Sequence, residues 1–87
     1  MKTQAIDVFQ RQLGRRLKAL RTGCGLTQRE VAAYVGLSRV AVGYFEQGRR
    51  LPSVGTLYSL AGLYGMTISE LCDVDSRPSY RVGCSIS

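Results

Sequence analysis

Apolar residues recur at helical spacing in five successive stretches of the chain. In the first stretch they follow one another at steps of three and four, the period of an amphipathic helix; they are Ile6, Phe9, Leu13, Leu17 and Leu20. The same spacing, with capping residues and glycines at the ends, predicts four shorter helices. The predicted helices cover about residues 5–22, 27–35, 38–47, 53–64 and 67–72. The pattern therefore predicts an all-α fold.

The second and third predicted helices carry the clearest local signals. Thr27 and Ser38 are good N-cap residues, because their hydroxyls accept hydrogen bonds from the amides of a first helical turn. Thr27 also forms a capping box with Glu30. Gly36, between the two helices, suits the left-handed conformation that ends a helix. Two short helices joined by a turn with glycine form a helix-turn-helix, here over about residues 27–47.

A different pattern follows Pro78, where apolar and polar residues alternate strictly as in a β-strand. The apolar positions are Tyr80, Val82, Cys84 and Ile86. Because a lone strand is not stable, one interpretation is that two copies pair their tails across a two-fold axis. The alternative is a disordered terminus. We therefore expect a domain over residues 1–73 and a C-terminal tail over 74–87, which is a candidate dimerisation strand.

Basic charge is concentrated in the first part of the chain. The net charge is +6, and residues 1–50 contain ten of the twelve Lys and Arg residues but only three of the six acids. A polyanionic partner such as DNA or RNA fits this asymmetry. The alternative is basic charge that only aids solubility.

The sequence does not indicate an enzyme, a metal site or a cofactor site. It contains no histidine, no C-x-x-C pair and no glycine loop of the kind that cradles phosphate. Its three cysteines are expected to be reduced thiols. No run is long and apolar enough to span a membrane, and the N-terminus lacks the apolar core of a signal peptide. We therefore expect a cytoplasmic protein that does not enter a membrane.

A linked set of residues runs from the end of the first predicted helix into the fifth. The set is Leu20-Arg21, Leu26-Thr27-Gln28, Val31-Ala32, Gly36-Leu37-Ser38, Val42, Phe45-Glu46, Gly48, Pro52-Ser53, Thr56-Leu57, Leu60-Ala61, Gly65 and Glu70-Leu71. With these residues the chain resembles the lambda-repressor-like, Cro-type helix-turn-helix family of bacterial and phage regulators, also called the xenobiotic-response-element family. The resemblance covers roughly residues 13–73. It implies five helices, the third of which lies in the major groove of double-stranded DNA.

The third predicted helix has one face for contacts with base edges. Val42 and Phe45 are expected to face the core. The face left exposed is then Arg39, Val40, Gly43, Tyr44 and Gln47, and the resemblance assigns the first four of these to the bases. Arg39 can bind O6 and N7 of a guanine, or else a phosphate. Tyr44 can touch a thymine methyl or a phosphate. Family members usually carry polar residues at the positions of Val40 and Gly43, so this face favours readout by methyl contacts or DNA shape.

Other residues are assigned to the DNA backbone. The resemblance implies that Gln28 contacts a phosphate and braces the recognition helix, and Ser38 suits both capping and a phosphate contact. Further phosphate candidates are Arg29, Gln47, Arg49 and Arg50, although any of these arginines could instead be a solvated surface residue. The family also pairs Glu46 with the arginine that matches Arg21, which would tie the third helix to the first.

The leading functional hypothesis is a homodimeric, sequence-specific regulator of transcription, such as a repressor, that binds an inverted repeat. The dimer candidates are the tail residues Tyr80, Val82, Cys84 and Ile86, and a surface of the fourth helix that comprises Leu51, Gly55, Tyr58 and Gly62. A second hypothesis is an antitoxin, or a phage or restriction-system controller, that binds DNA and also a protein partner. A third is a protein- or RNA-binding module, which the expected burial of Phe9 and Phe45 makes weaker.

Overall fold

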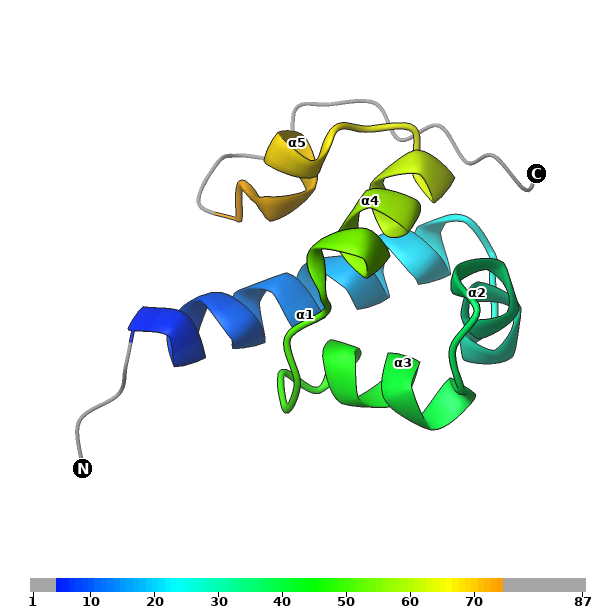
Figure 1. Ribbon diagram of the computed structural model, residues 1–87, viewed down its shortest axis with the longest axis horizontal. Coiled ribbons are helices and arrows are strands. Elements are labelled where there is room, and N and C mark those ends of the chain that lie inside the picture. Colours follow the sequence, from blue (N-terminus) through cyan, green and yellow to red (C-terminus); the bar gives the residue numbers. More distant parts are fainter. Residues whose placement is uncertain (1–4, 75–87) are drawn as a thin grey trace.

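The computed structural model describes residues 5–74, which form five helices and no strand (Figure 1). The helices are α1 (Ala5–Gly23), α2 (Gln28–Val35), α3 (Arg39–Glu46), α4 (Val54–Leu63) and α5 (Ile68–Cys72). The all-α prediction is confirmed, and each predicted helix end lies within one residue of the observed end. The tail positions Tyr80, Val82, Cys84 and Ile86 lie outside the described residues.

The helices begin at the caps that the sequence predicts. The Thr27 hydroxyl accepts a hydrogen bond from the Glu30 amide, and the Thr27 amide donates to the Glu30 carboxylate, so the capping box is complete. The Ser38 hydroxyl accepts from the amide of Ala41 and begins α3. Gly36 ends α2 with φ 73°, in the left-handed region where a side chain would be strained. The turn of the helix-turn-helix is therefore built by these local interactions.

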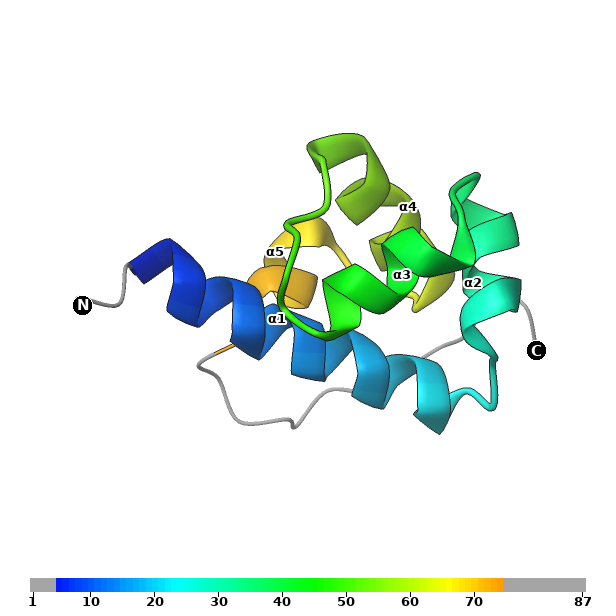
Figure 2. The ribbon, with the colours of Figure 1, turned by 90° about the horizontal axis from the view of Figure 1, so that it is seen from below.

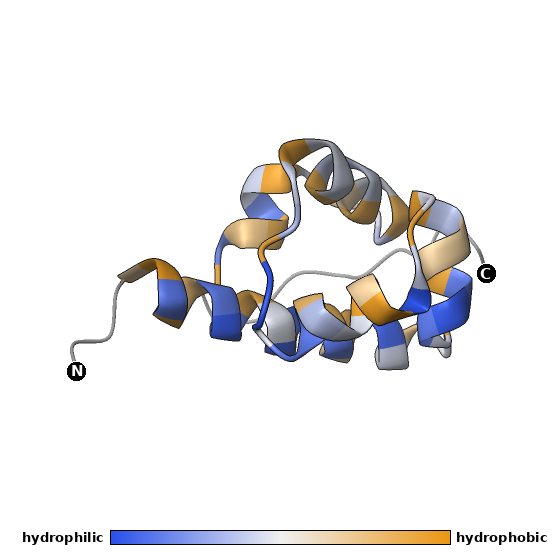
Figure 3. Ribbon diagram, turned by 60° about the horizontal axis from the view of Figure 1, so that its bottom comes forward, coloured by the Kyte–Doolittle hydropathy of each residue, from blue (hydrophilic) through white to orange (hydrophobic). Residues whose placement is uncertain are grey.

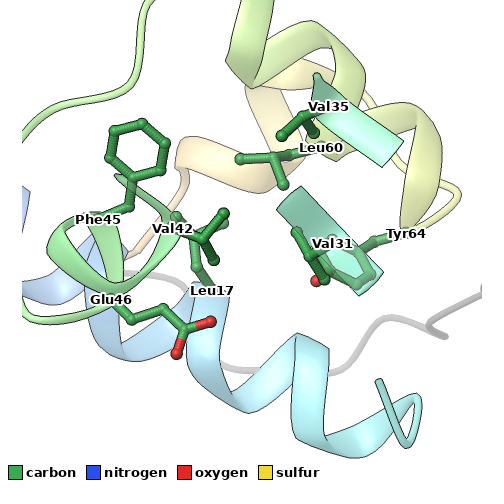
Figure 4. A pocket seen from close by; sticks show the side chains of 8 residues that line it. All are labelled: Leu17, Val31, Val35, Val42, Phe45, Glu46, Leu60 and Tyr64. Atoms are coloured by element: carbon green, nitrogen blue, oxygen red, sulfur yellow. The ribbon is translucent and has the colours of Figure 1, made fainter. Parts of the chain in front are cut away.

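The core lies where α1, α2, α3 and α4 meet. Figure 4 shows side chains from these four helices pointing toward one another; the buried ones are Leu17, Val31, Val42, Phe45, Leu60 and Tyr64. The carboxylate of Glu46 lies at the edge of this cluster. Helix α5 packs against α4 and buries Leu71 completely. This shared core fixes the position of α3 relative to α1 and α2.

The first turns of α1 are less buried than their periodicity predicts. Ile6 is 50% exposed, although it belongs to the predicted apolar stripe, and Val8 is 39% exposed. Figures 1 and 2 both show this end of α1 projecting beyond the other helices. Ile6 thus belongs to the apolar stripe by its spacing but not to the core, because no described element reaches that far along the helix. None of the described helices has the length and apolar character needed to cross a membrane.

Two glycines bring α1 and the end of α3 into direct backbone contact. A Cβ atom on Gly14 would lie 2.5 Å from the carbonyl oxygen of Phe45 and 2.7 Å from that of Glu46. Gly48, just after α3, has φ +73°, and its Cβ would lie 2.8 Å from the Cα of Arg11. The side-chain amide of Gln10 donates to the Gly48 carbonyl at 3.2 Å. The absence of side chains at these two positions therefore allows α3 to lie directly on α1.

Candidate nucleic-acid interface

Helix α3 turns one face into the core and the other toward solvent. Val42 and Phe45 are buried, as expected. On the opposite side Arg39, Tyr44 and Gln47 are exposed, and Val40 is 52% exposed. The side chains near the start of α3 are thus available to a partner, which is the geometry by which recognition helices contact base edges.

Gly43 does not belong to this exposed surface. It is buried, and a Cβ atom there would lie 3.8 Å from both polar atoms of the Gln28 side chain and 4.0 Å from the Nε2 of Gln47. The expectation that Gly43 is exposed was therefore wrong, because the side chain of Gln28 reaches over it from α2. Gly43 instead provides room for this glutamine.

A chain of hydrogen bonds joins α1 to the exposed face of α3. The Nε of Arg21 donates to the Oε2 of Glu46 at 2.7 Å, and its Nη2 donates to Oε1 at 3.1 Å. The same Oε1 accepts from the Nε2 of Gln28 at 3.1 Å, and the Oε1 of Gln28 accepts a longer bond from the Nη1 of Arg39 at 3.4 Å. The ion pair expected between Arg21 and Glu46 is present. Gln28 links this pair to the first residue of α3.

The Arg21–Glu46 ion pair is largely buried from solvent. The side chain of Glu46 is 5% exposed and that of Arg21 is 13% exposed. The hydrogen bonding that Arg21 donates to the Glu46 carboxylate raises the pKa of Arg21, against the opposing effect of desolvation. A third bond, from the Nη1 of Arg21 to the carbonyl of Leu26 at 2.8 Å, also fixes the start of α2. One guanidinium group therefore ties together α1, α2 and α3.

Two basic hollows lie at the ends of the exposed face of α3. The first lies beside the N-terminus of α2 and is lined in part by Gln28, Arg29 and Arg39. The second is lined by Tyr44, Arg49 and Arg50, and the guanidinium carbon of Arg49 lies 5.4 Å from the centroid of the Tyr44 ring. The structure thus brings most of the predicted DNA-contacting residues together in two groups, one at each end of the exposed face. Tyr58 is separate from both, on α4.

One structural contact has no signal in the sequence pattern. Arg16, on α1, donates through Nη2 to the carbonyl of Glu70 at 2.8 Å and through Nη1 to that of Asp73 at 3.3 Å. These carbonyls lie at the C-terminal end of α5, where a helix has unsatisfied acceptors. Nearby, burial raises the pKa of the Cys72 thiol, and the charge of Arg16 partly opposes this. Arg16 is thus a cap for α5 supplied by a distant part of the chain.

Comparisons with known proteins agree with this geometry. The chain matches the helix-turn-helix domain family over residues 12–73. It is 35% identical over 65 residues to the transcriptional regulator PuuR of Escherichia coli, which covers 75% of this chain and 35% of PuuR. It is 44% identical over 59 residues to the uncharacterized regulator y4dJ of Sinorhizobium fredii, which covers 68% of this chain and 77% of that protein. The chain thus spans about a third of the length of PuuR.

A solved structure gives the same result. The restriction-modification controller protein C.AhdI from Aeromonas hydrophila is 38% identical, with a TM-score of 0.65, over 70% of this chain and 92% of that one. The family match over residues 12–73 contains α2 to α5 and the part of α1 that follows its first turns. The resemblance inferred from the sequence is confirmed. The chain belongs to the lambda-repressor-like helix-turn-helix family of DNA-binding domains.

Proposed function

We propose that the chain regulates transcription by binding a specific operator as a homodimer, with α3 in the major groove of each half-site. The observation that carries this proposal is the exposed face of α3 between two basic hollows. Arginines at both ends of a reading helix are placed to contact phosphates and so to position the helix in a groove. Such a regulator acts on DNA in the cytoplasm, by binding and without catalysis.

Base readout is assigned to the first turns of α3. Arg39 can bind O6 and N7 of a guanine, and its link to Gln28 orients it before DNA arrives. Val40 can contact the methyl group of a thymine. The ring of Tyr44 is held by Arg49 where it too can meet a base edge. Gly43 has no side chain to contact a base, so nothing protrudes from α3 at this position between Val40 and Tyr44. A site read by so few hydrogen bonds would also depend on DNA shape.

The phosphate contacts are assigned around this face. Gln28 begins α2, where the exposed amides and the helix dipole favour an anion. Ser38 begins α3 in the same way. Arg29 lines the first hollow, Arg49 and Arg50 line the second, and Gln47 follows the last turn of α3. These contacts would set the position of α3 in the groove without reading the sequence.

The small size of the reading surface supports a homodimer. One helix reads only a few base pairs, whereas two copies related by a two-fold axis read an inverted repeat with half-sites about 34–36 Å apart. The likeness to C.AhdI over 92% of that chain favours a second candidate within the same class, a controller of a restriction-modification system. A protein partner beyond the second copy, as in an antitoxin, remains a further hypothesis.

Selection of bound sequences from a pool of random duplex DNA tests the proposal. We expect an inverted repeat to be enriched, and the same selection with Arg39→Ala should lose the preference at one symmetric pair of positions. Arg39→Ala removes a fork that discriminates by about 1–3 kcal/mol. Failure to enrich any sequence would contradict operator binding. Enrichment of a single half-site without its repeat would contradict the dimer.

A further inference from the structure

The outward face of α4 is exposed and carries no charge. Val54, Tyr58 and Gly62 follow one another at steps of four residues and so share one side of the helix. Val54 is 75% exposed and Tyr58 is 73% exposed, the largest exposures among the bulky apolar residues described. The whole helix, VGTLYSLAGL, contains no charged residue. Figure 3 shows α4 in orange and pale shades, without the deep blue bands seen on α1 and α2.

An exposed helix of a small domain usually carries charged residues on its solvent side. A helix with apolar residues all round is typical of one that is covered on both sides, and α4 carries Val54 and Tyr58 on its outer side. Within the described part of the chain, only the inner side of α4 is covered. This side carries the buried residues Leu57, Leu60 and Ala61. The outer side therefore has the composition of a contact surface.

A shallow apolar hollow lies next to this face, between α4 and α5. It has a volume of about 410 Å³ and is lined by Tyr58, Ala61, Gly62, Met66, Thr67 and Ile68. Gly62 keeps it open, because a Cβ atom there would meet no atom within 4 Å. Thr67 supplies a hydroxyl at the wall, which is the kind of partner that a buried tyrosine O–H requires. The hollow can therefore take the ring of a tyrosine that enters from outside.

We propose that α4 and the hollow form a two-fold interface in which Tyr58 of each copy enters the hollow of the other. This inference names the contact surface of the dimer and rests on the proposed function. A two-fold interface needs a self-complementary patch, and here a protruding ring and a hollow lie side by side on one face. The occupant is a second copy of this chain.

The charge distribution favours this surface over the rest of the molecule. Residues 1–50 have a formal charge of +7, so two copies that met through that region would repel each other. The face of α4 avoids this repulsion. Figure 1 shows α4 and α5 along one edge of the molecule and α3 along the other. A dimer formed through the outward face of α4 therefore does not cover α3.

Two variants test the interface without disturbing the fold. Gly62→Glu adds a charge at the hollow, at a position where a Cβ atom has no neighbour within 4 Å, and glutamate is a better helix former than glycine. Tyr58→Arg removes the ring and adds like charges across the two-fold axis. The matched controls are Gly23→Glu, at another open position in a helix, and Tyr34→Arg, which replaces an exposed tyrosine on α2.

Sedimentation equilibrium gives the first measurement. Wild type and both controls should be dimers, and Gly62→Glu and Tyr58→Arg should be monomers with unchanged helical circular dichroism. On DNA, the two α4 variants should bind an isolated half-site as wild type does. They should lose about 100-fold or more in affinity for the full inverted repeat, because the second half-site no longer adds its avidity.

The outcomes separate this inference from the proposed function. A monomeric wild type that binds the full repeat no better than a half-site would overturn the interface, as would α4 variants that stay dimeric through another surface such as the tail. A dimer that depends on Tyr58 and Gly62 but binds no duplex DNA would support the interface and contradict the operator proposal.

Discussion

At the scale of single residues, one carboxylate at the end of α3 holds the reading helix in place. Glu46 accepts two hydrogen bonds from Arg21 and one from Gln28, and its side chain is only 5% exposed. A buried ion pair is worth little compared with a well-packed apolar pair, but removal of one partner leaves the other charge stranded. Removal of Glu46 should therefore destabilise the fold most when Arg21 is still present and has lost its partner.

Glu46→Ala should lower the free energy of unfolding by about 3–5 kcal/mol, because Arg21 is left without its partner. For a domain of this size that loss lowers the Tm by about 12 °C or more. Thermal unfolding followed by circular dichroism measures this change. The double variant Arg21→Met/Glu46→Met is the control and should lose much less than Glu46→Ala. Equal Tm values for Glu46→Ala and wild type would contradict the structural role.

Cys72 gives a second prediction at this scale, through pH. Its folded-state pKa is raised above the ordinary value of 9.0 by burial. The folded chain then binds this proton more tightly than the unfolded chain, so stability falls as pH rises above 9.0 toward the folded-state pKa. Urea unfolding of wild type and Cys72→Ser across this range should show a constant difference below about pH 8 and a loss in wild type above 9.0. A pH-independent difference would contradict the shift.

The sequence predicts residues well where their partners are near in the chain. The capping boxes of Thr27 and Thr67 depend on residues three positions away, so they can be read directly from the sequence. The burial of Gly43 could not be predicted in this way, because it depends on the side chain of Gln28 from another helix. The contact of Arg16 with α5 spans more than fifty positions and leaves no local pattern.

At the scale of elements, the contact between α1 and α3 decides where the reading helix lies. Gly14 sits inside α1, where glycine is normally unfavourable by about 1 kcal/mol relative to alanine. Here the carbonyls of Phe45 and Glu46 occupy the space that a Cβ atom would need. The helix ends could be predicted from caps and glycines. This close approach could not, because it depends on the angle at which two helices cross.

Gly14→Ala should therefore destabilise the domain, by about 1–3 kcal/mol, although alanine is the better helix former. The added methyl group meets backbone atoms, which cannot move aside without shifting α3. Gly23→Ala, in the last turn of the same helix, is the control, because nothing lies within 4 Å of its Cβ; it should be neutral or stabilising. Chemical unfolding of both variants measures the difference. A stabilised Gly14→Ala would show that α3 does not lie as close to α1 as described.

At the scale of the whole molecule, basic side chains and exposed apolar side chains lie along different edges. Five arginines line the two hollows at the ends of α3, and the largest exposed apolar residues lie on α4. The sequence predicts this division, because the basic residues lie in 1–50 and the uncharged helix follows them. It does not predict the hollow between α4 and α5, which depends on how these helices pack. Under the two proposals above, this division leaves one edge for a polyanion and another for a second copy of the chain.

Substitutions that remove the charge of an arginine, or keep the charge and change the shape, can distinguish phosphate contacts from base contacts. Each phosphate contact releases counterions, so the logarithm of affinity falls with the logarithm of salt concentration. Arg50→Ala should reduce that slope by about one for each copy of the chain on the operator, without changing the preferred sequence. Arg50→Lys keeps the charge and should keep the slope. This pair of results is expected if Arg50 contacts a phosphate and no base.

Arg39 should behave in the opposite way. Arg39→Lys keeps the charge but loses the planar fork that grips two atoms of one guanine. It should leave the salt slope unchanged and weaken the preference at one symmetric pair of positions, by about 1–3 kcal/mol per site. Titrations of operator and single-base variants over a range of salt concentrations measure both effects. If Arg39→Lys lowered affinity equally for all sequences, Arg39 would be a phosphate contact, and base readout would depend on Val40, Tyr44 and the shape of the DNA.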